Sequence, residues 1–153
     1  MSIVHRSLSS RQLGASAVEF ALVFPLFFMI FYAIVTFSMI FVVQQGLTLA
    51  AEEGARAALN YQLAPNINTA LGKRTAFACQ VATGLTTWLE TKVDCSSDWA
   101  PCAYDATMAC VTVTLTYDYK DRPLVPPMPL LNVTLPSQLT SMATVQLNPG
   151  YVL

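Results

Sequence analysis

The chain has 153 residues and a net charge of -1, with 54% hydrophobic and only 11% charged residues. This balance excludes an electrostatic basis for binding nucleic acid or an acidic substrate. The length leaves room for one membrane helix and one small domain of about 90 residues, so several domains are not expected.

Residues 1–14 form a polar, basic segment that we expect to be a disordered cytoplasmic leader. His5, Arg6 and Arg11 supply its positive charge, and it contains no acidic residue. Positively charged flanks stay on the cytoplasmic side of a membrane. The C-terminal part of the chain is therefore predicted to lie on the other side, in the periplasm.

An almost unbroken apolar run follows from Gly14 to Val43. At about 1.5 Å rise per residue, the part from Phe20 onward reaches roughly 36 Å, enough to cross a hydrocarbon core of about 30 Å. The run therefore predicts a transmembrane helix over residues 20–43. A cleaved secretory signal peptide is the competing interpretation, but its apolar core is shorter, about 7–15 residues.

One acidic residue, Glu19, lies near the start of this run. A carboxylate at the edge of the hydrocarbon costs several kcal/mol unless it is paired or neutralised, which favours a functional role. The alternative is that Glu19 only reaches the lipid headgroups.

The helix is predicted to continue beyond the membrane, because Gln44–Asn60 contains mostly good helix formers and no proline. We expect one long helix in the segment 15–61, from about Ser16 to Tyr61. Small residues recur at every fourth position and share one face, on which another backbone can approach closely. They are Gly46, Ala50, Gly54 and Ala58. This face is expected to pack on the chain's own C-terminal domain, between subunits, or both.

Several polar side chains of the long helix have predicted local partners. Thr36 and Ser38 can donate hydrogen bonds back to their own helix. Glu52 precedes Arg56 by four residues, and such an exposed ion pair contributes a few tenths of a kcal/mol. The pair indicates a solvated stripe.

A second, amphipathic helix is predicted over about residues 69–90. A turn around Pro65 precedes it, and Asn68 or Thr69 can cap its start. Trp88 falls in register with the apolar face, so we assign it to the core and not to a ligand site.

The stretch from Lys92 to Cys110, "KVDCSSDWAPCAYDATMAC", has the composition of a loop. Asp94, Asp98 and Asp105 are loosely spaced in it, and a calcium site built from them stays open although no D-x-D-x-D pattern is present. The alternative is ordinary turn chemistry, in which an aspartate accepts from its own backbone.

Alternating residues predict two strands of a small antiparallel sheet. In residues 111–120 the apolar set at the odd positions alternates with polar residues, which indicates one buried and one exposed face. Residues 139–147 can pair back with this strand. The proline-rich residues 121–138 between them are predicted to be an extended loop that wraps the domain or contacts a neighbouring subunit. Residues 62–153 are thus an extracytoplasmic domain, and the fold class is α+β.

All four cysteines, Cys79, Cys95, Cys102 and Cys110, follow the apolar run. An even number in an oxidising compartment predicts two disulfides, with three possible pairings. We favour Cys95–Cys102 with Cys79–Cys110, because the first closes a short loop and the second joins helix to strand. A four-cysteine zinc site is the alternative, but no C-x-x-C pair is present.

The residues around Gly14 resemble a processing signal. The string "G-ASAVEF" is similar to the processing site of class III prepilins, which is cut after its glycine. The mature chain would then start at Ala15, with Glu19 fifth and Phe20 sixth. Together with "ALVFPLFF" and the later "LAAEEGARAAL", the segment from Arg11 to Leu59 resembles TadE-like minor pilins, or pseudopilins, of the tight-adherence (Flp/Tad) type IV pilus system.

This resemblance implies a non-enzymatic protein, without cofactor or metal, that a prepilin peptidase processes and that takes part in pilus assembly for surface adhesion. The implied partners are the peptidase, other pilin and minor pilin subunits, the inner-membrane assembly platform and membrane lipid. The implied location is the bacterial inner membrane, single pass, or the extracellular pilus. Glu19 would neutralise the new amino terminus at Ala15 of the same or an adjacent subunit.

Two other interpretations are open. An uncleaved single-pass scaffold protein of the inner membrane shares every feature except processing. A membrane-anchored enzyme is disfavoured, because the sole histidine, His5, lies in the leader and no histidine-based catalytic group can form outside. The sequence also contains no G-x-S-x-G and no glycine-rich phosphate loop.

Overall fold

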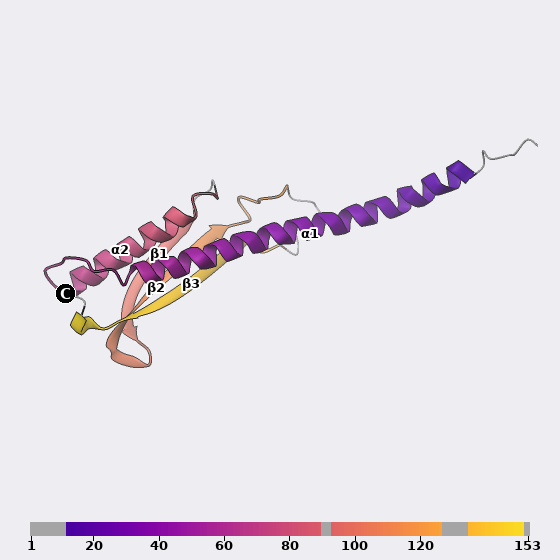
Figure 1. The fold of residues 1–153 in the computed structure, drawn as a ribbon. Helices are drawn as coiled ribbons and strands as arrows, with labels where there is room; N and C mark the ends of the chain where they lie inside the picture. The colour runs from indigo at the N-terminus through magenta and orange to yellow at the C-terminus, as the bar shows by residue number, and fades with distance from the viewer. Residues whose placement is uncertain (1–11, 90–92, 127–134, 152–153) are drawn as a thin grey trace, which may run out of the picture. The chain divides into compact units, whose positions relative to one another are not determined.

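The computed structural model describes residues 12–89, 93–126 and 135–151. In chain order they form α1 (Gln12–Ala57), α2 (Ile67–Leu85), β1 (Asp94–Cys102), β2 (Asp105–Asp118), β3 (Gln138–Leu147) and a short 3-10 helix (Pro149–Tyr151) (Figure 1). The predicted α+β class, with a long apolar helix, a second helix and an antiparallel sheet, is confirmed. The chain divides into two compact units, residues 1–38 (unit 1) and 39–153 (unit 2), whose boundary falls within α1.

Helix α1 begins before the predicted Ser16 and ends at Ala57, four residues before the predicted Tyr61. An arginine from α2 explains its C-terminal end. The buried guanidinium of Arg74 donates from Nη1 to the carbonyl oxygens of Ala58 and Leu59, both at 3.2 Å. Carbonyls at the end of a helix need such donors because no further helical turn supplies them.

Helix α2 also differs from its predicted bounds. Its N-cap is Asn66, whose Oδ1 accepts from the backbone N–H of Thr69 at 2.8 Å, so the prediction of Asn68 or Thr69 as the cap was wrong. The helix ends at Leu85, where the N–H of Thr86 turns back to the carbonyl of Thr83. Trp88 therefore lies beyond the helix and is 52% exposed. Its assignment to the core was wrong.

The three strands form one antiparallel sheet in the order β1-β2-β3. The predicted pairing of residues 139–147 with the central strand is confirmed, with Val111 opposite Val145 and Tyr117 opposite Leu139. The prediction of a loop over residues 92–110 was wrong, because β1 and the first part of β2 lie there. Most side chains of β1 are exposed, so its sequence lacks the alternation of a half-buried strand.

The core of unit 2 lies between one face of this sheet and the two helices. The odd-numbered side chains from Val111 to Tyr117 of β2, and Tyr119 just after it, are buried as predicted. They belong to the same cluster as Leu47 of α1 and Leu71 of α2. Figure 1 shows α2 beside β1 and the C-terminal part of α1 beside β3. The opposite face carries threonines, and the hydroxyl oxygens of Thr112 and Thr144 lie 2.9 Å apart across β2 and β3.

Two disulfides are present, but the favoured nested pairing was wrong. Cys79 of α2 bonds Cys95 of β1, with their Cα atoms 5.8 Å apart, and Cys102 bonds Cys110 across the β1–β2 turn, with 5.0 Å between the Cα atoms. The unpredicted strand β1 is the reason, because it places Cys95 beside α2 and Cys102 opposite the start of β2. A four-cysteine zinc site is excluded, since both bonds together use all four sulfur atoms.

Candidate functional site

The described side chains of unit 1, from residue 16 onward, make a mostly apolar, exposed helix surface. Between Val18 and Phe37 the valine, leucine, isoleucine, methionine and phenylalanine side chains are all at least one third exposed. A continuous apolar surface of this size is not stable in water and marks a contact with lipid or protein. Among the described residues, α1 is the one helix that is long and apolar enough to cross a membrane, over Ser16–Ala57. It is a candidate membrane anchor.

Phenylalanines form two short rows on this surface. The ring centroids of Phe20 and Phe24 are 5.3 Å apart, those of Phe24 and Phe28 are 6.2 Å apart, and those of Phe27 and Phe31 are 6.5 Å apart. Side chains four residues apart stack along a helix. These rows were not predicted from the sequence, although their four-residue spacing is visible in it.

The predicted processing and assembly residues lie on the first turns of α1. Gly14 is open, because a Cβ atom added there would meet nothing within 4 Å. Glu19 follows Ala15 by four residues, which is one helical turn, and its side chain is exposed. Glu19 forms no ion pair with any residue that the structure describes. The helix therefore holds its carboxylate where another group can reach it.

The small-residue face of α1 is covered by the chain's own domain. Ala50 and Ala58 are fully buried. A Cβ atom added to Gly54 would lie 2.8 Å from the Cβ of Ala82, and one added to Gly46 would lie 2.7 Å from Cζ2 of Trp88. Only glycine allows these close approaches. Within unit 2, this face is thus an intramolecular contact.

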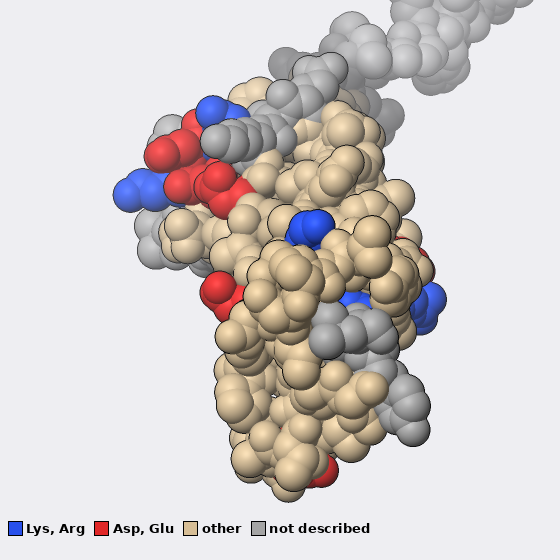
Figure 2. All heavy atoms as spheres, turned by 90° about the vertical axis from the view of Figure 1, so that its left-hand side faces the viewer, with Lys and Arg blue, Asp and Glu red and all other residues tan. Residues whose placement is uncertain are grey.

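The exposed side of α1 carries an ion pair, but not the predicted one. Arg56 Nη1 lies 3.0 Å from Oε1 of Glu53, three residues away, and not beside Glu52. Both spacings place two side chains on neighbouring helix positions, so the sequence could not choose between them. Figure 2 shows that most of the face it presents is uncharged and that its acidic and basic residues lie intermingled.

The three aspartates of the β1–β2 region do not form a site. Asp105 Oδ1 accepts from the backbone N–H of Thr107 at 2.9 Å and from its hydroxyl at 2.6 Å. Both bonds hold the pKa of the Asp105 carboxyl below its usual value, and the bond from the Thr107 hydroxyl has the larger effect. Turn chemistry is thus confirmed at Asp105. In the described ranges, no group of three or more His, Cys, Asp or Glu side chains could hold a metal ion.

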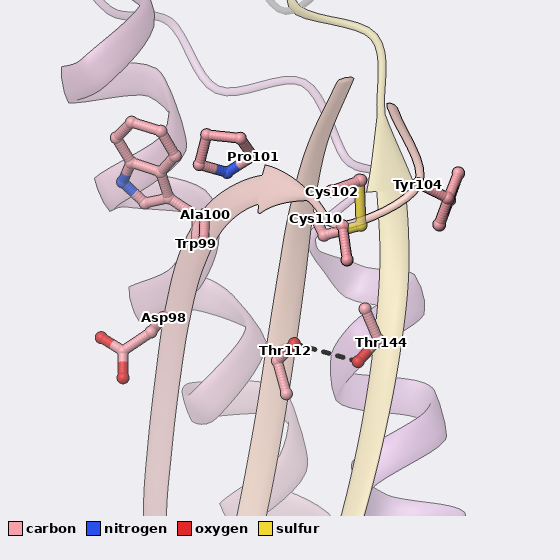
Figure 3. A pocket seen from close by; sticks show the side chains of 10 residues that line it. Asp98, Trp99, Ala100, Pro101, Cys102, Tyr104, Cys110, Thr112 and Thr144 are labelled. Carbon is pink, nitrogen blue, oxygen red and sulfur yellow. Dashed lines mark hydrogen bonds between the residues drawn. A yellow bond between two sulfur atoms is a disulfide. The ribbon is translucent and has the colours of Figure 1, made fainter. Parts of the chain in front are cut away.

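A shallow hollow of about 390 Å³ lies near the β1–β2 turn (Figure 3). Trp99 and Tyr104 lie on opposite sides of the Cys102–Cys110 disulfide in this view. The Tyr104 hydroxyl donates to Oε1 of Gln146 at 2.9 Å. Asp98 is the single ionisable carboxylate of its lining.

Together these features define a protein with an apolar N-terminal helix, a candidate membrane anchor, followed by a disulfide-linked α+β domain. The family model described as TadE-like protein matches residues 14–56. The segment resembling TadE-like proteins is thereby confirmed, from Gly14 almost to the end of α1, and it points to a protein associated with Tad pili. No curated protein matches the chain. No solved structure matches it either.

Proposed function

We propose that this chain is a minor pilin of a tight-adherence pilus, cut after Gly14 by a prepilin peptidase and assembled through α1. The observation that carries the proposal is the family match, which starts at Gly14 and covers α1 to Arg56. The surface of unit 1 supports it, because an exposed apolar helix can exchange lipid contacts for contacts with other helices. The leader would lie in the cytoplasm and residues 62–153 in the periplasm.

Glu19 is the assembly residue in this proposal. Cleavage after Gly14 creates a positively charged amino group at Ala15, one turn from the carboxylate. An unpaired charge in an apolar core is costly, so an amino terminus from an adjacent subunit would be held beside Glu19. Coulomb attraction is strong where the dielectric constant is low, and it would favour one axial register between subunits.

Processing is tested by expressing the full chain with and without a prepilin peptidase and sequencing the amino terminus of the membrane-bound form. We expect a start at Ala15 only with the peptidase. A start at Met1 in both cases would favour the uncleaved scaffold interpretation and reject the pilin.

Assembly is tested with Glu19→Gln, which keeps the size of the side chain and removes its charge. We expect normal membrane insertion and processing but a loss of assembled pili in sheared surface fractions. Glu52→Gln is the matched control, because Glu52 is also an exposed acid of α1. Unchanged assembly with Glu19→Gln would make this residue a headgroup contact.

A further inference from the structure

The end of unit 2 at which α1 enters carries an unusual set of exposed apolar side chains. On α1 itself, Ile40 and Val43 are buried in the core of unit 2, whereas Phe41 and Val42 between them are 66% and 55% exposed. At this level one side of the helix contacts the domain. Its other side still presents the apolar surface of a membrane helix.

Trp88 lies at the same level. Its ring is against Gly46, where an added Cβ would be 2.7 Å from Cζ2. Gly46 follows Val43, the predicted last residue of the membrane span, by three residues, or about 4.5 Å along the helix. Tryptophan is enriched at this depth of a bilayer, where its ring contacts acyl chains and its N–H contacts headgroups.

The loop after β2 completes this end of the domain. The Tyr117 hydroxyl donates to the carbonyl of Arg122 at 2.7 Å, and the N–H of Lys120 donates to the carbonyl of Ser137 at 3.0 Å. Residues 122–124 of this loop and Trp88 border a hollow of about 450 Å³. Its lining residues are Met39, Trp88, Leu89, Tyr117, Arg122, Pro123 and Leu124.

We propose that this end of unit 2 is a membrane seat, formed by Phe41, Val42, Trp88, Arg122 and Leu124, that rests in the interfacial layer of the bilayer crossed by α1. The proposal rests on the membrane anchoring in the proposed function. Lipid is the favoured occupant, because the apolar part of α1 in unit 1 continues without a break into Met39, which lines the hollow.

Arg122 would reach phosphate groups while its stem stays among apolar groups. Asp118, Lys120 and Asp121 lie close to Arg122 in sequence, and the four charges balance. The seat therefore depends on aromatic and apolar contact, not on anionic lipid.

The chain contains only two tryptophans, which gives a direct test. Trp99 is the internal control. It lies opposite Val111 in the sheet, and Val111 lies opposite Val145. Val145 and Ala55 of α1 line the same hollow. Ala55 is nine residues beyond Gly46, or about 13 Å farther along the helix. Trp99 should thus lie clear of the bilayer.

The full chain is reconstituted in phosphatidylcholine vesicles whose acyl chains carry bromine at a shallow position. The Trp99→Phe variant reports Trp88, and the Trp88→Phe variant reports Trp99. We expect quenching of Trp88 that is several-fold larger than that of Trp99 and unchanged by added phosphatidylglycerol or salt.

Insertion of α1 is checked separately by Phe31→Trp in a chain with both native tryptophans replaced by phenylalanine, using deeply brominated lipid. Quenching of this variant without quenching of Trp88 would overturn the seat and leave the anchor intact. Quenching of neither would overturn both. Emission of Trp88 that depends on protein concentration and not on bromine would reject lipid in favour of a second copy of the chain.

Discussion

The two parts of helix α1 differ in exposure. In unit 1, its leucines and phenylalanines are exposed, and Leu26 is 60% exposed. In unit 2, Leu47 is fully buried against α2 and the sheet. The two parts differ in composition: residues 39–57 contain three charged residues, two glutamines and two glycines, whereas residues 15–38 contain one charged residue and no glycine. Small residues let α2 approach the second part, whereas bulky side chains keep the first part open to lipid or other helices.

The largest expected effect comes from removing a buried leucine. Leu47→Ala should lower the free energy of unfolding of unit 2 by about 2–5 kcal/mol, because it leaves a cavity in the core. Leu26→Ala is the matched control on the same helix and should change that free energy by less than about 0.5 kcal/mol. Denaturant titration of the full chain in detergent, followed by tryptophan emission, measures both. Equal effects would contradict the difference between the two parts.

A smaller effect is expected from adding one methyl group to the crowded glycine. Gly54→Ala should destabilise unit 2 by about 1–3 kcal/mol, because the new Cβ would meet the Cβ of Ala82 and the carbonyl of Ala78. Gly72→Ala is the control within α2, where nothing lies within 4 Å of an added Cβ. It should stabilise by about 0.5–1 kcal/mol, since alanine is the better helix former. The same titration would show opposite signs, and a stabilising Gly54→Ala would reject the close helix contact.

The smallest effect is expected at the exposed ion pair. Glu53→Gln should lower the stability of unit 2 by about 0.2–0.5 kcal/mol at low salt, and the difference from wild type should vanish at high salt. Glu19→Gln should leave this stability unchanged, because Glu19 lies in unit 1. A loss at Glu53 that persists in high salt would show that Glu53 acts through packing and not through charge.

The elements with a regular pattern could be predicted from the sequence, and those shaped by a neighbour could not. The alternation from Val111 to Tyr119 specified a strand with one buried face, and the length of the apolar run specified a long helix. β1 was missed because most of its side chains are exposed and its sequence shows no apolar alternation. Trp88 matched the helical period, but α2 ends before reaching it.

For the candidate site, Gly14 and Glu19 stay predictions from the sequence. The small-residue face could be predicted because its four-residue spacing is a local signal. The existence of two disulfides was predicted from the even number of cysteines and their position after the apolar run. Their pairing was decided only by the tertiary structure, since β1 brings Cys95 to α2. The tertiary structure also decided which part of α1 is covered. Burial depends on which elements pack against a helix, and the periodicity of the helix sequence does not specify those elements.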